Sequence, residues 1–581
     1  MAARRGVWLV IVLIVFAVSI SALGMLLLVS AVGREPQVSG NSTLVLRIGG
    51  DLNEMDAGGV LGPFIEGPPT VRSVVGMLRK AKADKRITSV IVKPSGSGAL
   101  WGKVQEVRDA VLDFRRSGKP IVAYLEYGGE QEFYLATACD KVFLMPAATL
   151  DLTGMASYEL FLRGTLDKIG AYPDALHIGE YKTYSNTFTQ HTYTPAHREM
   201  AESLNTDLFE QLVRGIADGR KKSEADVKAL IDHGPFLPED ALRAGLIDDL
   251  AYEDQLDDKV KLASGKLHYV EMNEYRQVSA GGLGLNRGPK IAVIYATGLI
   301  ASGKSSYDGT GGQVVGAETL VEYLRKARAD SSIKAIVLRV DSPGGSAIAS
   351  DVIWREVVLT KNLKPLVASM SDVAASGGYY IAMPAHAIVA EPSTLTGSIG
   401  VVLTKFVIDG TLKKLGMNME GVSQGKYANL YSPVRPFSPE ERARMAENMQ
   451  ATYDTFVEKA AQGRNTTPER IDAIGQGRVW TGRQAKEIGL VDELGGLDRA
   501  VALAKQRAKI AQDTEVELMI YPPKKSIYDL LRDPLGNADR ASTLASLLGI
   551  GNPKVMQALT APLQVFRRGE PLALMPNVFV R

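Results

Sequence analysis

Ser376 is the residue of this sequence best placed to act as a nucleophile. It lies in the run Ser371-Asp-Val-Ala-Ala-Ser-Gly-Gly378, between a predicted strand and a predicted helix. The adjacent glycines leave room for a carbonyl group to approach, and free backbone N–H groups at the start of a helix suit a developing oxyanion. The alternative is that Ser376 only caps the helix, because serine is a favoured N-cap residue.

A second glycine-containing loop, Asp341-Ser-Pro-Gly-Gly-Ser346, follows a predicted buried strand that ends near Arg339. A Gly-Gly pair at the end of a strand can turn a backbone N–H toward a substrate. The alternative is an ordinary tight turn, for which this composition is common. Two such loops at the ends of neighbouring strands can together supply both N–H donors of an oxyanion hole.

A nucleophilic serine requires a general base, and the sequence offers histidine or lysine. A lysine base must be neutral, and burial in apolar surroundings lowers its pKa toward that state. Lys182, in Ile178-Gly-Glu-Tyr-Lys-Thr-Tyr184, is set among aromatic and small residues, although most lysines are solvated surface groups. None of the six histidines lies in a distinctive motif with an acidic partner, but a Ser-His-Asp triad is defined by geometry and stays open. The histidines are His177, His191, His197, His233, His268 and His386.

Alternating strands and helices must position these candidates. In the first half, apolar patterning predicts strands at 44–48, 89–92 and 120–124 and helices at 71–83 and 104–116. In the second half it predicts strands at 290–295, 334–339 and 365–369 and helices at 317–329 and 347–360. Such alternation is typical of an α/β layered fold.

The two halves repeat one another at an offset of roughly 245 residues. Two pairs of segments correspond: RKAKADKRITSVIVKPSGSG in the first half with RKARADSSIKAIVLRVDSPGG in the second, and LTGM at 152–155 with LTGSIG at 395–400. The pattern predicts a tandem duplication and not a short-period solenoid. We expect a first repeat at 44–275, a linker at 276–289, a second repeat at 290–520 and an extension of unassigned role at 521–581.

The halves differ where chemistry is expected. Ser376 falls opposite Glu130 or Gln131, neither of which is a nucleophilic hydroxyl, and the first half lacks the contiguous Pro-Gly-Gly. A duplicated domain keeps in both copies what folding needs, whereas catalytic groups need not be kept in both.

The N-terminus predicts a membrane anchor. The run from Val7 to Val32 holds no charged residue, and Arg4 and Arg5 precede it. Such a run can cross a hydrocarbon core of roughly 30 Å, and the basic end is expected to stay in the cytoplasm. We therefore expect an anchor at 1–32, a linker at 33–43, and catalytic domains outside the cytoplasm. The alternative is a cleaved signal peptide, although its apolar region is normally shorter, about 7–15 residues.

Bulk composition narrows the function further. The 67 basic and 65 acidic side chains nearly balance, so charge gives no reason to expect a nucleic-acid partner. The single cysteine, Cys139, excludes an intrachain disulfide and a cysteine-cluster metal site.

The sequence resembles the signal peptide peptidase A family in its long, duplicated form. The matching motifs cover nearly all of 44–510 and include GEYKTYSNTF, VDSPGGS, DVAASGGYYIA, STLTGSIGV and VWTGRQAKEIGLVDELGGLDRAV. The resemblance implies that Ser376 is the nucleophile, Lys182 the general base and Ser398 the residue that orients the lysine. Through the wider Clp-protease and crotonase superfamily, it implies that Gly344 or Gly345 together with Gly377 form the oxyanion hole.

The resemblance also implies two tandem crotonase-like ββα superhelix repeats, no metal or cofactor, and peptide hydrolysis through an acyl-enzyme. Expected substrates are cleaved signal peptides and other unfolded apolar segments, and expected assembly is a homotetramer at the inner membrane, on its periplasmic side. The segment after Lys182, TYSNTFTQHTYTP, departs from the charged pattern of the family and leaves the substrate contacts open. Lys426 is the rival base and Ser371 the rival nucleophile. A crotonase-type acyl-CoA enzyme and a catalytically idle membrane scaffold are the alternative functions.

Overall fold

Both halves of the chain contain the predicted alternation of strands and helices. The computed structural model describes residues 16, 19–20, 36–55, 69–259, 268–307, 313–523, 571–575 and 579–580. Most of the predicted anchor and most of the extension after residue 521 lie outside these residues. Within the described ranges, no helix has the length and apolar character needed to cross a membrane.

The first half is built on a six-stranded sheet in which every pair is parallel, in the order β7-β4-β3-β2-β1-β8. Its central strand β3 is Ile-Val-Ala-Tyr-Leu and is buried along its whole length, as expected for a parallel strand covered on both faces. The strands are β1 (Ser42–Gly50), β2 (Ile87–Ser97), β3 (Ile121–Leu125), β4 (Lys141–Leu144), β7 (Asp249–Leu250) and β8 (His268–Glu271).

The second half repeats this order strand for strand. Its sheet runs β20-β16-β15-β13-β9-β21, again with parallel pairs, and β17 and then β19 extend it beside β15. The duplication read from the sequence is therefore a duplication of topology. The strands are β9 (Lys290–Thr297), β13 (Ile333–Ser342), β15 (Leu366–Ala375), β16 (Ala387–Ala390), β17 (Leu395–Gly397), β19 (Val479–Thr481), β20 (Glu493–Leu494) and β21 (Glu517–Tyr521).

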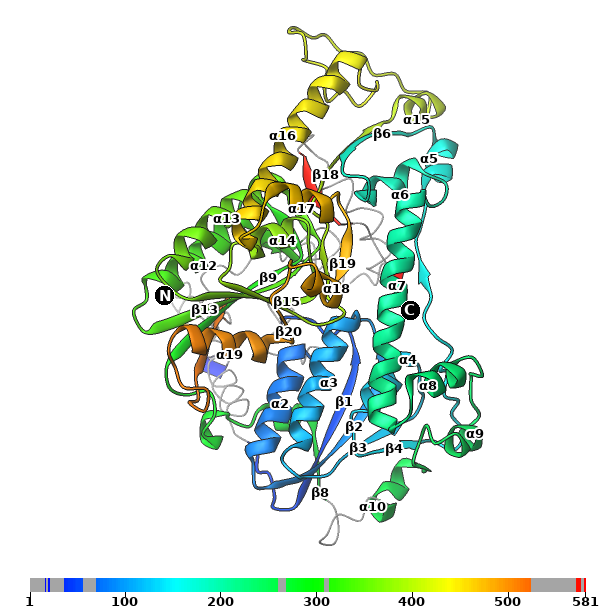
Figure 1. The fold of residues 1–581 in the computed structure, drawn as a ribbon, viewed down its shortest axis with the longest axis vertical. Helices are drawn as coiled ribbons and strands as arrows, with labels where there is room; N and C mark the ends of the chain where they lie inside the picture. The colour runs from blue at the N-terminus through cyan, green and yellow to red at the C-terminus, as the bar shows by residue number, and fades with distance from the viewer. Residues whose placement is uncertain are drawn as a thin grey trace, which may run out of the picture.

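Helices connect the strands in both halves of the chain (Figure 1). Those of the first half are α2 (Val71–Ala83), α3 (Trp101–Arg115), α4 (Glu130–Ala136), α5 (Arg163–Ile169), η1 (Thr183–Ser185), α6 (Asn186–Thr189), α7 (Pro195–Arg220), α8 (Glu224–Ile231), α9 (Pro238–Arg243), η2 (Glu253–Gln255), α10 (Leu256–Lys259), α11 (Met272–Arg276) and η3 (Gly281–Leu283). Those of the second are α12 (Ala317–Ala329), α13 (Ala347–Lys361), α14 (Gly377–Ala382), α15 (Asp409–Lys414), α16 (Pro439–Arg464), α17 (Pro468–Ile474), α18 (Gly482–Glu487) and α19 (Leu497–Arg507).

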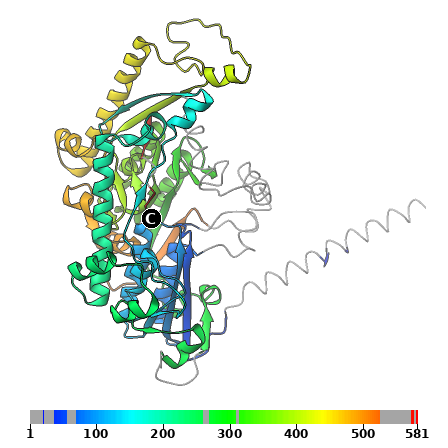
Figure 2. The same ribbon diagram turned by 90° about the vertical axis from the view of Figure 1, so that its right-hand side faces the viewer.

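The long helices α7 and α16 show how local sequence sets these elements. Both have 26 residues and begin with proline after a capping residue, Thr194 or Ser438, whose side chain accepts a hydrogen bond from the first turn. Proline suits the first helical position, because a backbone N–H there has no acceptor within the helix and its absence loses no hydrogen bond. Helix α7 contacts α4 of its own half and β19 of the other half, and it runs alongside both halves in Figures 1 and 2.

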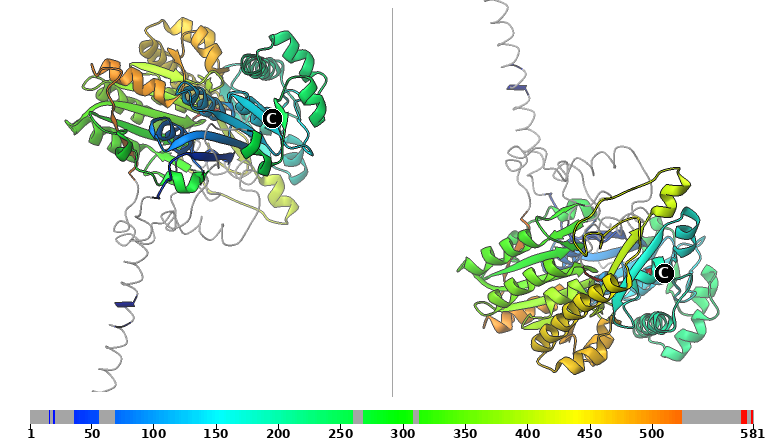
Figure 3. Two further views of the ribbon diagram at one scale, coloured as in Figure 1. Left: turned by 90° about the horizontal axis from the view of Figure 1, so that it is seen from below. Right: turned by 90° about the horizontal axis from the view of Figure 1, so that it is seen from above.

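A third, mixed sheet joins the halves and carries the candidate residues. Its order is β11-β12-β10-β14-β22-β18-β6, so β6 of the first half pairs antiparallel with β18 of the second. Figure 1 labels β6 and β18 near the top of the molecule, and Figure 3 shows the same ribbon from below and from above. The strands are β6 (Tyr172–Ile178), β10 (Leu299–Ala301), β11 (Ser306–Tyr307), β12 (Gln313–Gly316), β14 (Gly344–Ser346), β18 (Val401–Val407) and β22 (Leu572–Leu574), and β5 (Ser157–Tyr158) pairs separately with β23 (Phe579–Val580).

Candidate active site

Ser376 lies between the last residue of β15 and the first residue of α14. Its φ of 55° and ψ of −113° place it in a region that residues other than glycine rarely adopt. Its backbone N–H donates to Gly397 O at 2.8 Å, which ties this conformation to β17. The Ser376 side chain makes no capping hydrogen bond to α14, so its hydroxyl is available for other chemistry.

Lys182 reaches Ser376 from the other half of the chain. It follows β6, and its Nζ lies 2.7 Å from Ser376 Oγ, 2.8 Å from Ser398 O and 3.0 Å from Ser398 Oγ. All three residues are fully buried. The structure thus brings Lys182 together with Ser376, 194 positions away in sequence, and with Ser398, 216 positions away.

Burial lowers the pKa of Lys182 well below its usual value. Desolvation is the cause of this shift, because burial destabilises the charged ammonium. The surroundings therefore favour the neutral amine, which is the form that accepts a proton.

Two glycines, Gly477 and Gly400, leave space for the Lys182 side chain. Gly477 has a φ of +78°, and a Cβ at this position would lie 2.5 Å from Lys182 N and 2.6 Å from its Cα. A Cβ on Gly400 would lie 3.0 Å from Lys182 Cδ. Gly400 lies in the sequence motif LTGSIG, whereas no sequence motif distinguishes Gly477.

The glycines predicted to bind an oxyanion lie next to one another. A Cβ on Gly377 would lie 3.1 Å from both Gly344 Cα and Gly345 N, so the two loops are in backbone contact. Gly344 and Gly345 have φ values of +107° and +151°, which side-chain-bearing residues rarely adopt. The structure therefore collects the backbones of all three predicted glycines beside Ser376.

The rival residues lie elsewhere or have other partners. Ser371 donates to Glu54 and accepts from Arg339 Nη2 at 3.0 Å within a buried ionic network. Lys426 is exposed and forms an ion pair with Glu440, which raises its pKa. In the described residues no histidine hydrogen-bonds to Ser376; for example, His197 Nε2 pairs with Glu159 at 2.6 Å.

The buried ionic network that holds Ser371 comes from both halves, and sequence reasoning missed it. Arg339 Nε and Nη2 donate to the two oxygens of Glu54 at 2.8 Å each, and Arg339 Nη2 also donates to Glu106 at 2.5 Å. Burial opposes ionisation of Glu54, but the charge of Arg339 prevails and lowers the pKa of Glu54 to about 2. Arg339, Glu54 and Glu106 lie in no recognisable local motif, so no sequence pattern predicts that they meet.

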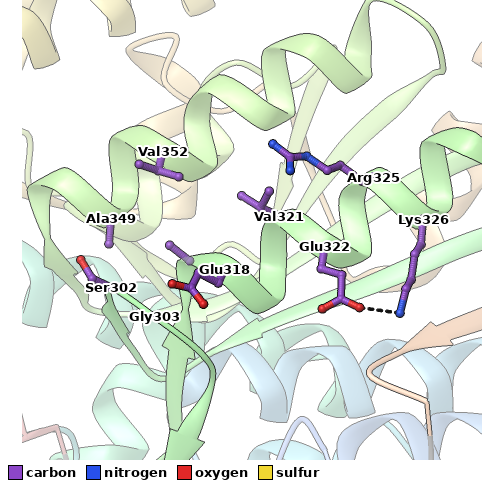
Figure 4. A pocket seen from close by; sticks show the side chains of 10 residues that line it. Ser302, Gly303, Glu318, Val321, Glu322, Arg325, Lys326, Ala349 and Val352 are labelled. Atoms are coloured by element: carbon purple, nitrogen blue, oxygen red, sulfur yellow. Dashed lines mark ion pairs between the residues drawn. The ribbon is translucent and has the colours of Figure 1, made fainter.

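A separate pocket of about 520 Å³ lies between α12 and α13 (Figure 4). Glu322 and Lys326 form an ion pair of 2.6 Å at one end of it. It contains none of the candidate catalytic residues. Its lining is Ser302, Gly303, Ala317, Glu318, Val321, Glu322, Arg325, Lys326, Ala349 and Val352.

Comparison with known protein families identifies the family to which this chain belongs. The model of peptidase family S49 matches the sequence twice, at residues 113–266 and 359–511. The chain belongs to peptidase family S49. One S49 match therefore falls in each half of the duplicated fold, which accounts for the repeated topology.

Named relatives of this S49 chain extend over most of its length. It is 40% identical to the chloroplastic serine protease SPPA of Arabidopsis thaliana, over 78% of this chain and 68% of that relative. It is 34% identical to Protease 4 of Salmonella typhi, over 84% and 78%, and 31% identical to Protease 4 of Haemophilus influenzae, over 76% and 74%. The S49 chain described here is a serine protease.

Proposed function

We propose that this S49 protease hydrolyses peptide bonds with a Ser/Lys dyad, in which Ser376 is the nucleophile and Lys182 the general base. The observation that carries the proposal is the 2.7 Å separation of Lys182 Nζ and Ser376 Oγ in a fully buried setting. A neutral amine has two N–H donors and one lone pair. Ser398 O and Oγ can accept the two donors, which leaves the lone pair for the Ser376 hydroxyl proton.

The proposed reaction proceeds in two stages, acylation and deacylation. Ser376 Oγ bonds to the scissile carbonyl carbon while its proton passes to Lys182 Nζ, and the resulting ammonium then protonates the departing amine. Water next attacks the acyl carbon while its proton passes to Lys182 Nζ, and the resulting ammonium protonates Ser376 Oγ as the C–O bond to the acyl group breaks. In this scheme Ser398 is a positioning residue that directs the amine.

Gly344 or Gly345 and Gly377 are the proposed oxyanion-hole residues. Their backbones converge beside Ser376, and backbone N–H groups held in advance stabilise charge as it develops on the carbonyl oxygen. We also propose that each repeat is a crotonase-like ββα superhelix, in agreement with the repeated strand order.

The proposed substrates are unfolded apolar segments, including cleaved signal peptides. Membership of a peptidase family supports a peptide substrate, and the residue directly before Ser376 packs in an apolar cluster with Met200, Leu395 and Val479. Family membership and the buried dyad favour this function over the acyl-CoA enzyme and the idle scaffold.

We propose that the chain is anchored by the apolar run Val7–Val32 and assembles as a homotetramer at the inner membrane, with catalytic domains on the periplasmic side. The uncharged run after Arg4 and Arg5 supports the orientation. A phosphatase fused after Gly50 is expected to be active outside the cytoplasm. An inactive phosphatase together with a bright cytoplasmic reporter at the same junction would reverse this topology.

An activity-based fluorophosphonate probe tests the catalytic proposal. The wild type is expected to react at Ser376, as located by mass spectrometry of the labelled peptide. Ser398→Ala is expected to react more slowly at the same residue, because Lys182 loses one of its two Ser398 partners. Labelling at a different serine, or equal labelling of a Ser376→Ala variant, would refute the assignment.

A further inference from the structure

Arg478 of the second repeat lies between two aromatic rings beside the candidate dyad. Its guanidinium carbon is 4.7 Å from the centre of the Tyr181 ring and 4.5 Å from the centre of the Trp480 ring. A guanidinium is attracted to both rings, because it is cationic, planar and weakly hydrated. Tyr181 directly precedes Lys182 in the first repeat, whereas Trp480 belongs to β19 of the second. The stack of Tyr181, Arg478 and Trp480 thus joins a neighbour of the proposed base to a strand of the other repeat.

The Trp480 end of this stack leads to the proposed nucleophile. Trp480 Nε1 donates to Ile474 O at 3.0 Å, which fixes the indole. In the pairing of β19 with β17, Trp480 faces Thr396, and a Cβ on the next residue, Gly397, would lie 2.9 Å from Trp480 Cδ1. Gly397 O in turn accepts the hydrogen bond of Ser376 N at 2.8 Å. The indole therefore packs on the residue that holds the backbone of Ser376.

The backbone of Arg478 contacts the segment that directs the Lys182 amine. Arg478 O accepts a hydrogen bond from Ser398 N at 2.7 Å. Ser398 O and Oγ are the two groups that lie 2.8 and 3.0 Å from Lys182 Nζ. The residue before Arg478 is Gly477, which lies against the backbone of Lys182. A shift of Arg478 would therefore move both the residue proposed to orient the base and the residue that makes room for it.

An ion pair to the first repeat also holds the Arg478 side chain. Arg478 Nη1 donates to Glu199 Oε1 at 2.6 Å, and Tyr181 Oη donates to the other oxygen of the same carboxylate at 2.9 Å. The next residue along each segment adds a contact, since Val479 N donates to Met200 Sδ at 3.2 Å. The Glu199 side chain is 56% exposed, and a charge pair with an exposed carboxylate contributes little to stability. The two rings are therefore the stronger constraint on Arg478.

We propose that Arg478 is a positioning residue for hydrolysis, which fixes Lys182 relative to Ser376 across the two repeats. It acts through Tyr181 on the side of the base and through Trp480 on the side of the nucleophile. The inference rests on the proposed function, because it takes Lys182 and Ser376 as the dyad. A base and a nucleophile on separate repeats require such a constraint, since a displacement of about 1 Å can lower the rate roughly a hundredfold.

The test compares Arg478→Gln with Arg483→Gln in the full-length chain. Arg483 is the matched control, because it comes from the same part of the second repeat and also pairs with carboxylates of α7, those of Asp207 and Glu210. With a fluorogenic peptide, Arg478→Gln is expected to lower kcat about 10–100-fold and to change KM less than about twofold. Arg483→Gln is expected to keep the wild-type kcat. It is nevertheless expected to lose more stability, because Asp207 is buried whereas Glu199 is exposed.

Two further variants separate the contribution of the rings from that of the ion pair. Arg478→Lys keeps a cation that can pair with Glu199 but loses the planar group that lies between the rings. Its kcat is expected to fall nearly as far as that of Arg478→Gln. Glu199→Gln keeps the stack and is expected to retain at least about half of the wild-type kcat. If Arg478→Gln does not fold, the comparison of Arg478→Lys with Arg483→Gln replaces it.

The pH–rate profile provides a readout that a loss of stability alone does not change. Lys182 is fully buried, and desolvation lowers its pKa. Displacement of Arg478 and Gly477 would admit water beside the lysine and stabilise its charged form. The rising limb of the Arg478→Gln profile is therefore expected to shift to higher pH, whereas the profile of Arg483→Gln is expected to match that of the wild type.

Three results would overturn the inference: equal kcat values in Arg478→Gln and Arg483→Gln, an increase in KM with unchanged kcat in Arg478→Gln, or a pH–rate profile of Arg478→Gln identical to that of the wild type. Fluorophosphonate labelling separates this inference from the proposed function. If the wild type is labelled at Ser376 and the two variants are labelled at equal rates, the dyad stands and only the positioning role of Arg478 fails. Labelling of the wild type at another serine would refute both.

Discussion

Lys103 of the first repeat holds Asp372 of the second, four residues before Ser376. The Asp372 carboxylate accepts hydrogen bonds from the backbone N–H groups of Lys103 at 2.8 Å and Leu100 at 2.9 Å, and it lies 3.4 Å from Lys103 Nζ. The same Nζ lies 2.8 Å from Asp341, at the start of the glycine loop. Burial disfavours the charge of Lys103, but the nearby carboxylates prevail and raise its pKa. One first-repeat side chain thus contacts both loops of the site.

Lys103→Met is expected to lower the free energy of unfolding by about 3 kcal/mol, because it leaves the buried Asp372 and the partly buried Asp341 without their cation. Lys82→Met is the matched control. Lys82 pairs with Asp113 at 2.8 Å on the surface, so its loss is expected to cost less than about 1 kcal/mol. Denaturant unfolding of both variants provides the measurement, and equal losses would contradict the structural role assigned to Lys103.

Ser376→Ala is expected to abolish hydrolysis, because it removes the side-chain oxygen that attacks the substrate. The fold is expected to stay intact, because the backbone of Ser376 is held by other contacts. Ser371→Ala removes a partner of Glu54 and Arg339 and is expected to cost about 1–2 kcal/mol of stability while retaining activity. Peptide hydrolysis and thermal unfolding of both variants test this pair. An exchange of the two activity results would identify Ser371 as the nucleophile.

Activity is expected to rise with pH through the depressed pKa of Lys182, since only the neutral amine accepts the Ser376 proton. Lys182→Arg is expected to be as inactive as Lys182→Ala, because a guanidinium stays protonated. Lys426→Ala is expected to keep most activity, since Lys426 is exposed and paired with Glu440. The pH–rate profiles of these proteins are the measurement, and a fully active Lys182→Ala enzyme would eliminate the Ser/Lys mechanism.

Sequence patterns were sufficient to predict the repeated elements and to name Lys182 and Ser376 as candidates, and the reasons are physical. Strands such as Ile121–Leu125 are continuous apolar runs between turn residues, which identify buried parallel strands directly. The pairing of β6 with β18, by contrast, joins 172–178 to 401–407 and depends on tertiary packing. Lys182 could be named from its motif, but its contact with Ser398 required that pairing to be seen.

The other missed features have no local signature. Lys103 and Arg339 are ordinary basic residues in sequence, and only folding places them against carboxylates from distant segments. The segment 571–575 reads as a short apolar run with proline, and its partner Gly344 lies more than 200 positions away. Contacts of this kind follow from the arrangement of both repeats and not from periodicity.

The stability of the protein should also report the neutral state of Lys182, independently of catalysis. Between its depressed folded pKa and about 10.4, Lys182 is protonated when unfolded and neutral when folded, so unfolding takes up a proton. Its contribution to the unfolding free energy therefore rises with pH across this window, by at most about 1.4 kcal/mol per pH unit. Lys182→Met lacks this term. The difference in unfolding free energy, wild type minus Lys182→Met, is expected to increase with pH, and a flat difference would mean that the folded lysine stays charged.

Gly477 should be required because of the space it leaves for Lys182. Gly477→Ala would place a methyl group 2.5 Å from Lys182 N in a backbone with a φ of +78°. Gly489→Ala is the control, since Gly489 has a φ of +87° but no atom within 4 Å of the added Cβ. The left-handed backbone should cost both variants about 1–2 kcal/mol of stability. Only Gly477→Ala should also displace the lysine, and a shift of about 1 Å in a catalytic group can lower the rate roughly a hundredfold. We therefore expect kcat to fall by roughly 10–100-fold in Gly477→Ala and to stay near the wild-type value in Gly489→Ala. Equal kcat values in the two variants would show that Gly477 serves only the turn and not the position of the base.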